Sequence, residues 1–246
     1  MAKVTLVDFT GKGRLDEAWH AADMLIYTKS TRLNMTASLL EGIKAMTPEK
    51  KVSELEYMAG TIPSSWEFVD VTFLIEGVSR ATAQQITRTR TASYAMQSQR
   101  VTDASEFAAV NPHPQGTLLQ SMFAEAVTQS MRNYTVMVEN GAALQDARGL
   151  LPMNVVCNLV AKYNLRSFVD LLKARSSLRV QGEYVDIADQ MRKEVLAAWP
   201  WVAPFFADKH ASAIKMLEDA ARDVGITTGH GPGWAIAKAI DLLRKN

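Results

Sequence analysis

The sequence has very few of the residues from which disulfide frameworks and metal sites are built. Cys157 is its only cysteine, so an intrachain disulfide is impossible and a cysteine-rich zinc site is excluded. The four histidines, His20, His113, His210 and His230, are scattered and never stand at the spacing of metal ligands. We therefore expect neither a disulfide scaffold nor a metal site.

The chain also lacks an excess of charge of either sign and a long apolar run. Lys and Arg total 27 against 26 for Asp and Glu, which leaves no global basic field of the kind expected for a general nucleic-acid binder. The opening MAKVTLVDFT has no apolar core of a signal peptide, and no apolar run approaches the length that spans a bilayer. We therefore predict a cytoplasmic protein that binds neither nucleic acid nor membrane.

What the sequence does contain is ample material for a core, since 48% of its 246 residues are hydrophobic. Alternating apolar residues predict strands over 3–9, 65–78 and 154–164. Helical spacing predicts helices over 14–27, 35–46, 47–60, 79–93, 117–140, 143–151, 165–176 and 184–199, and two more in the tail. Thr47 and Ser79 stand where helix N-caps are expected. Because strands and helices are interspersed without a strict βαβ order, we predict an α+β fold.

One short stretch, RTRTASYAMQSQR over residues 88–100, places three arginines among Ser, Thr and Gln with no acidic residue. On a helix Gln85 and Arg88 share a face, whereas Arg88 and Arg90 diverge by about 200° and cannot serve one small ligand together. If the chain then leaves the helix, QSQR supplies a hydroxyl, backbone N–H groups and Arg100, which are the parts of a phosphate cradle. A solvated helix end with surface arginines is the alternative interpretation.

A second polar group lies downstream and comprises Arg148, Asn164, Arg166, Asp170 and Arg175. Singly, these residues have ordinary structural explanations. Arg166 and Asp170 are four apart and would form an intrahelical ion pair, and Asn164 is a natural helix N-cap. Only the combination of the two groups points to a function.

Together the two groups resemble the signature of the flavin-dependent thymidylate synthases. The first follows the family pattern of Arg-His-Arg and then Ser-x-Arg, with Arg88, Arg90, Ser98 and Arg100 at that spacing. The second follows another pattern of the family, in which an Arg precedes Leu-Pro. Asn-x-Arg-Ser then leads into a helix that ends in Arg, and Gln-x-Glu lies beyond that helix. Its residues in register are Arg148, Leu151, Pro152, Asn164, Arg166, Ser167, Arg175, Gln181 and Glu183. The resemblance covers roughly residues 1–205, so we predict a family-like domain over 1–204 and a C-terminal helical extension over 205–246.

The resemblance implies a fold with a mixed sheet and long helices, in a homotetramer whose active sites form between subunits. The diverging arginines would then reach two ligands, FAD and dUMP, at a shared interface. The residues that match nucleotide-binding positions are Gln85, Arg88, Ser98, Gln99, Arg100, Arg148 and Arg175. Those that match flavin positions are Arg88, Thr89, Arg90, Asn164, Arg166 and Asp170 and, more loosely, Ser64.

The activity that the resemblance implies is transfer of a methylene from methylenetetrahydrofolate to C5 of dUMP, with reduced FAD as the source of reducing equivalents and NADPH as its reductant. Arg175 matches the arginine that holds the N3/O2 edge of the uracil and is the implied catalytic residue. No enzyme thiol attacks the pyrimidine in this family, in keeping with Cys157 as a buried small hydrophobe in a predicted strand.

The sequence departs from the family pattern at several positions, namely Asp23, Phe68, Thr89, Met96, Asp170 and Val185. The phosphate and pyrimidine arginines are kept, whereas polar groups facing folate and flavin are altered. Three interpretations follow: a divergent thymidylate synthase, a flavoenzyme that hydroxymethylates dUMP or acts on dCMP, and an inactive nucleotide-binding homologue. Arg175 does not separate the first two, because a guanidinium that donates to ionised uracil N3 donates equally to cytosine N3.

Overall fold

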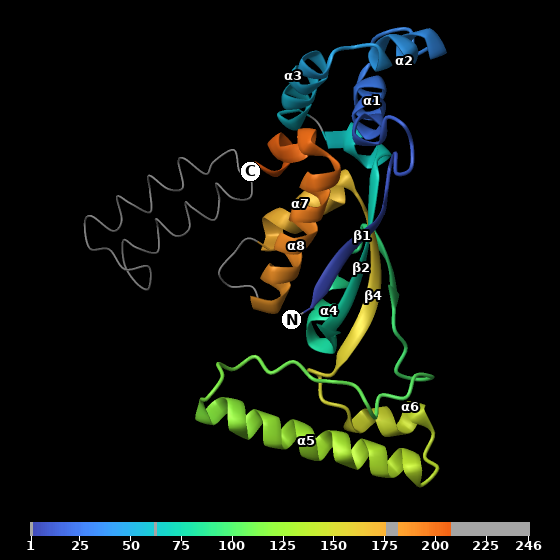
Figure 1. The fold of residues 1–246 in the computed structure, drawn as a ribbon. Coiled ribbons are helices and arrows are strands. Elements are labelled where there is room, and N and C mark those ends of the chain that lie inside the picture. Colours follow the sequence, from blue (N-terminus) through green and yellow to red (C-terminus); the bar gives the residue numbers. More distant parts are fainter. Residues whose placement is uncertain (1, 62, 176–181, 208–246) are drawn as a thin grey trace, which may run out of the picture.

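The structure, a computed structural model, describes residues 2–61, 63–175 and 182–207 and confirms the α+β class (Figure 1). Its strands are β1 (Lys3–Phe9), β2 (Asp70–Ser79), β3 (Ala92–Met96) and β4 (Val156–Asn164). Its α-helices are α1 (Glu17–Lys29), α2 (Ala37–Lys44), α3 (Pro48–Ala59), α4 (Arg80–Ile86), α5 (Leu118–Glu139), α6 (Leu144–Ala147), α7 (Leu165–Arg175) and α8 (Gly182–Ala198). Short 3-10 helices are η1 (Pro63–Phe68), η2 (Arg148–Leu150) and η3 (Pro200–Phe206). The predicted tail helices lie outside the described residues.

The four strands form one sheet in the order β1-β2-β4-β3, and every neighbouring pair is antiparallel. The predicted mixed sheet is therefore wrong. The reason lies in how α4 connects its two strands. It returns the chain so that β3 runs in the same direction as β2, as in a parallel crossover, but β4 inserts between them and runs opposite to both.

One face of the sheet carries the main core. Along β2 the residues Val71, Phe73 and Ile75 are fully buried, as their alternation predicted. Helices α7 and α8 pack against this face (Figure 1). The predicted strand over 65–78 begins late, because Pro63 opens η1 and Trp66 packs edge-on against Phe205 instead of joining the ladder. The main core thus includes η3.

The other face of the sheet is open toward β3 and β4. On β4 the alternate residues Asn158, Val160 and Lys162 are exposed, and so are Ser93 and Ala95 on the neighbouring strand. An antiparallel sheet tolerates one solvated face. Here the open face nevertheless includes the apolar Val160.

The predicted N-caps at Thr47 and Ser79 form, since each hydroxyl accepts a hydrogen bond from the first turn of the helix that follows, and the Thr117 hydroxyl caps α5 in the same way. The helix that starts after Ser79 was predicted to reach about 93 but ends at Ile86. The residues of β3 pair with β4 instead, and this long-range pairing overrides their local helical pattern. Arg88 and Arg90 therefore lie in a turn, and the argument from their angle on a helix is wrong.

Helices α5 and α6 form a separate layer beyond one end of the sheet (Figure 1). Their small core contains Ala104, Tyr134 and Ala147, and the Ala104 backbone nitrogen donates a 3.1 Å hydrogen bond to the Tyr134 hydroxyl. Tyr134 is the single buried residue among the 22 residues of α5. Within one chain α5 therefore buries little of its surface for a helix of this length.

Candidate active site

The first predicted motif extends along both sides of β3, which is an edge strand. Arg88 and Arg90 lie in the turn before the strand, beside the C-terminal end of β4, because the first residues of β3 pair with the last residues of β4. Ser98 and Arg100 lie beyond the other end of β3. Five strand residues span about 16 Å, so one chain holds the two halves of the motif apart.

Arg100 and Arg148 converge on one residue of α6, Gln145. The Arg100 guanidinium donates a long, 3.5 Å hydrogen bond to the Gln145 side-chain oxygen, and Arg148 Nε donates to the Gln145 carbonyl oxygen at 3.2 Å. Ser98 belongs to the same turn, since its hydroxyl accepts from the Arg100 backbone nitrogen at 3.3 Å. Neither arginine forms an ion pair with a carboxylate in the described part of the chain. Two uncompensated guanidinium groups and a hydroxyl suit an anion such as phosphate.

A second cluster forms where α7 begins. Asn164 Oδ1 accepts a 2.9 Å hydrogen bond from the Ser167 backbone nitrogen, so the predicted N-cap is confirmed. Arg166 pairs with Glu67 of η1 at 2.6 Å and not, as its spacing suggested, with Asp170. Asp170 is exposed on the same helix.

The remaining predicted flavin residues surround this cluster. Ser64 is exposed on η1, the 3-10 helix that also carries Glu67. The side chains of Arg88 and Arg90 are exposed, and neither forms an ion pair within residues 2–61, 63–175 and 182–207. The end of β4 thus gathers several polar side chains, while two of its arginines keep uncompensated charge.

Two departures from the family pattern find a structural explanation here. Thr89, which stands in place of the family histidine, contributes its backbone carbonyl oxygen, which accepts from the Tyr94 hydroxyl at 3.0 Å. This contact does not depend on the Thr89 side chain. Met96 ends β3 half-buried and packs against the main core, as an apolar residue should at a position on the core face.

Arg175, at the end of α7, lies among tyrosines that sequence reasoning did not single out. Its guanidinium carbon is 4.5 Å from the centroid of the Tyr184 ring. Burial raises the pKa of the Tyr184 hydroxyl, and the positive charge of Arg175 opposes that rise. Burial likewise raises the pKa of Tyr163, whose ring meets that of Tyr94 edge-on at 5.9 Å. Because both pKa values are raised, Tyr163 and Tyr184 are neutral at physiological pH.

Three buried polar atoms of this niche make no well-formed hydrogen bond among the described residues, namely Arg175 Nε and the hydroxyl oxygens of Tyr163 and Tyr184, although Tyr94 lies close to the Tyr163 hydroxyl and Arg175 and Thr89 lie close to that of Tyr184. Nearly all buried polar atoms in proteins are paired, so three orphans in one place call for an explanation. The only local signal for this niche was the inward position of Tyr163 in the alternation of its strand.

The other predicted nucleotide residues are spread over the neighbouring elements. Gln85 is half-buried near the end of α4. Gln99 is buried, and its side-chain nitrogen has no hydrogen-bond partner in the described part of the chain. The structure thus brings Ser98, Arg100 and Arg148 together but leaves Arg175 in a separate niche.

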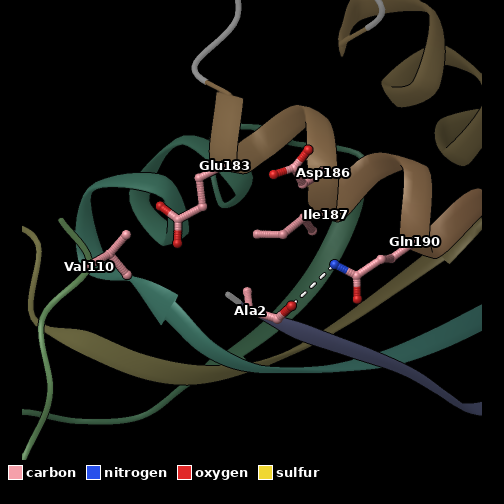
Figure 2. Close-up of a pocket in the computed structure, with 6 residues that line it drawn as sticks. All are labelled: Ala2, Val110, Glu183, Asp186, Ile187 and Gln190. Carbon is pink, nitrogen blue, oxygen red and sulfur yellow. Dashed lines mark hydrogen bonds between the residues drawn. The ribbon is translucent and has the colours of Figure 1, made fainter. Parts of the chain in front are cut away.

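A pocket of about 140 Å³ lies at the start of α8, and none of its lining residues is a predicted site residue (Figure 2). Two of its three polar side chains, Glu183 and Gln190, are already used for packing. Gln190 accepts from the Val4 backbone nitrogen and donates to the Ala2 carbonyl oxygen, both at 3.1 Å, which fixes β1 to α8. Glu183 binds the beginning of α4. We therefore interpret this pocket as a gap between packed elements and not as the active site.

Neither a metal-binding cluster nor a membrane-spanning helix is found in residues 2–61, 63–175 and 182–207. No group of three or more His, Cys, Asp and Glu side chains there could hold a metal ion. None of the helices there is long and apolar enough to cross a membrane.

Comparisons with known proteins agree with the two motifs. The family model for the thymidylate synthase complementing protein matches residues 5–201. A flavin-dependent thymidylate synthase of Nitratidesulfovibrio vulgaris is 35% identical over 135 residues, which are 51% of this chain and 55% of the relative. One of Pyrococcus abyssi is 27% identical over 201 residues, 79% of each protein. The match thus spans about half the length of the first of these relatives. Since the family model covers most of the sequence, the chain belongs to the thymidylate synthase complementing protein family, the family of flavin-dependent thymidylate synthases that its motifs resemble.

Proposed function

We propose that this protein transfers a one-carbon unit from methylenetetrahydrofolate to C5 of dUMP, forming dTMP, with reduced FAD as cofactor and NADPH as the reductant. The observation that carries the proposal is the convergence of Arg100 and Arg148 on Gln145, because it joins the two family motifs at one anion-binding position. Their charges are available to the 5′-phosphate of the nucleotide, and Ser98 adds a hydroxyl.

The residues at the end of β4 fit the diphosphate of FAD. Arg88 and Arg90 are exposed cations, and Asn164 and Ser64 supply an amide and a hydroxyl nearby. Arg166 is partly neutralised by Glu67, so it would contribute less charge unless that ion pair opens. The flavin supplies the reducing equivalents when it is bound, and the chain supplies position and charge.

Arg175 would act on the pyrimidine. C5 of a neutral uracil is a poor nucleophile, and loss of the N3 proton moves electron density toward C5. A guanidinium beside N3 and O2 stabilises this developing anion, an interaction that strengthens toward the transition state. In this role Arg175 is the catalytic residue of the chain.

A homotetramer would supply a packing partner for the exposed apolar side chains of α5. Along α5 five exposed apolar side chains fall within an arc of about 100°, at roughly 100° per residue. They are Leu118, Leu119, Met122, Val136 and Met137. This arc contains no charged residue; its apolar side chains lie toward the two ends of α5 with Gln129 and Asn133 between them, and exposed apolar side chains gathered on one face are typical of a subunit interface. The open face of the sheet, where Val160 and Ala95 lie among polar side chains, offers a second exposed surface.

Active sites between subunits would also reconcile the two halves of the first motif. One chain separates Arg90 from Ser98 by the length of β3. If a second copy packs against this edge, flavin residues of one subunit lie near phosphate residues of another. Residues 1–204 would then form the catalytic body. Residues 205–246 would be an extension, although Phe205 itself packs into the main core.

Product analysis tests the proposed reaction. The purified protein is incubated with FAD, NADPH, methylenetetrahydrofolate and dUMP, and the nucleotides are identified by mass spectrometry. We expect a mass gain of one CH₂ group on dUMP and no product from dCMP. A hydroxymethylated nucleotide, a product from dCMP only, or no product at all would contradict the proposal.

A further inference from the structure

The guanidinium of Arg175 lies over the aromatic ring of Tyr184, and this contact can hold the arginine side chain in place. The guanidinium carbon lies 4.5 Å from the ring centroid, well within the range of about 6 Å over which a cation is attracted to an aromatic face. No carboxylate among the described residues pairs with Arg175. The ring of Tyr184 is therefore its closest described electrostatic partner.

The Tyr184 ring is itself held rigidly. Tyr184 is fully buried in the first turn of α8. The residue before it, Glu183, accepts hydrogen bonds from the Ser79 backbone nitrogen at 2.8 Å and the Thr82 hydroxyl at 2.6 Å. This turn cannot shift without breaking the start of α4, so the ring is a fixed platform for the guanidinium.

The polar atoms of the niche argue against a purely structural role. Arg175 Nε is buried and makes no well-formed hydrogen bond in the described part of the chain. The side chains of Arg175 and Thr89 lie close enough to the Tyr184 hydroxyl to counter the rise of its pKa, so the guanidinium lies against both the ring and its hydroxyl. Arg175 as a whole is half-buried, and its Nε atom is inaccessible to solvent.

We propose that Tyr184 is a positioning residue, whose ring holds the Arg175 guanidinium in place for the pyrimidine of the nucleotide. This inference rests on the proposed function of Arg175. The ring performs the role by its aromatic face, so the hydroxyl is dispensable. Removing the ring frees the guanidinium among several rotamers, and the base then loses its pre-organised partner.

The test compares two ligands that differ only in the base, dUMP and 2-deoxyribose 5-phosphate. Their dissociation constants are measured by calorimetry or ligand-detected NMR for the wild type, Tyr184→Leu, Tyr184→Phe and Arg175→Ala. We expect Tyr184→Leu to weaken dUMP binding about tenfold and to leave the sugar phosphate within about twofold. Tyr184→Phe should bind both ligands as the wild type does. The double variant of Arg175→Ala with Tyr184→Leu should bind dUMP no more weakly than Arg175→Ala alone.

Control variants separate positioning from general damage. Phe205→Leu removes a buried aromatic ring from the same core at a distance from Arg175, and it should lower stability but not dUMP affinity. Tyr184→Met serves as the ring deletion if the leucine variant does not fold. Equal weakening of both ligands by the ring deletion would overturn the positioning role. Loss of dUMP binding in Arg175→Ala but not in Tyr184→Leu would overturn it and leave the proposed function of Arg175 intact. No loss in Arg175→Ala would overturn both.

Discussion

The carboxylate of Glu183 accepts two hydrogen bonds from Ser79, one from the backbone nitrogen at 2.8 Å and one from the hydroxyl at 2.5 Å. The Thr82 hydroxyl adds a third at 2.6 Å. A negative charge at the start of a helix is also favoured by the helix dipole. Through this contact α8 fixes α4, the helix that leads into the arginine motif.

The first prediction follows from this contact. Glu183→Gln keeps the shape of the side chain but removes its charge and one acceptor, so we expect a loss of about 1.5–3 kcal/mol in the free energy of unfolding, measured in urea. Asp186→Asn is the control, because Asp186 is exposed one turn further along α8, and it should change stability by less than about 0.5 kcal/mol. Equal stability of Glu183→Gln and the wild type would mean that water replaces the carboxylate at no cost.

The second prediction concerns the phosphate. Arg100→Ala and Arg148→Ala should each weaken dUMP binding roughly ten- to a hundredfold, since a charge-assisted contact is worth about 1.5–3 kcal/mol. Arg192→Ala, an exposed arginine on α8, should have no effect. Titration calorimetry measures all three. Unchanged affinity in both site variants would show that the phosphate is bound elsewhere.

The third prediction tests Arg175 as the catalytic residue. Lysine keeps the positive charge, including any interaction with the C-terminal dipole of α7, but loses the planar two-point contact. Arg175→Lys should therefore fold with nearly normal stability, still bind flavin, and lose methylene transfer by orders of magnitude. Turnover is measured from dTMP formation under saturating substrates. Turnover close to that of the wild type would reduce Arg175 to a structural role.

The fourth prediction concerns a buried ion pair formed by Asp23, one of the positions at which the sequence departs from the family pattern. Asp23 lies 2.7 Å from the Lys51 ammonium, and both side chains are almost inaccessible. Burial raises the pKa of Asp23, and Lys51 opposes that rise. Lys51→Met leaves the carboxylate without a cation, so we expect a loss of about 3–5 kcal/mol in the free energy of unfolding at pH 7.

The pH dependence of this variant has a definite sign. Because the folded-state pKa of Asp23 lies above its ordinary value of 3.8, the lost stability should return as the pH falls through the raised pKa toward 3.8. The double variant Asp23→Leu with Lys51→Met carries no buried charge and should recover most of the loss at pH 7. Denaturant titrations at several pH values measure this. A penalty for Lys51→Met that does not change with pH would exclude the ionised carboxylate as its cause.

The fifth prediction concerns assembly. Leu119→Glu combined with Met122→Glu places two charges in the apolar arc of α5 and should dissociate the homotetramer, as measured by light scattering at micromolar concentration. Ser121→Glu adds a charge to the same helix outside that arc and should leave the assembly intact. A wild-type protein that is monomeric at these concentrations would refute the proposed tetramer directly.

Several features followed from the sequence because their physical causes are local. The alternation of Val71, Phe73 and Ile75 predicted one buried strand face, and each of these side chains is buried. The N-caps at Thr47 and Ser79 form because a hydroxyl reaches a backbone nitrogen three residues on, whatever the rest of the fold does. The two arginine motifs likewise identified the family without any knowledge of the fold.

Other features were decided only by the tertiary structure. The helix was expected to continue past Ile86, but the chain forms β3 instead. The strand that pairs with β3 lies some seventy residues further along the chain, where Ala92 pairs with Tyr163, so no local pattern indicates this pairing. For the same reason the insertion of β4 between β2 and β3, which makes the sheet antiparallel, has no local signal.

The candidate site also combines features that were predicted from the sequence with contacts that only the tertiary structure decided. Residue types and spacing predicted that arginines, a serine and an asparagine bind anions. Which of these meet was decided by contacts between distant segments, such as Arg100 with Gln145 and Arg166 with Glu67. The ring of Tyr184 beneath Arg175 is another, because the chain must turn back from α7 to α8 before the two side chains can touch. Short local segments determine helix caps and the buried faces of strands. The contacts named here depend instead on how distant segments pack together, which no short segment specifies by itself.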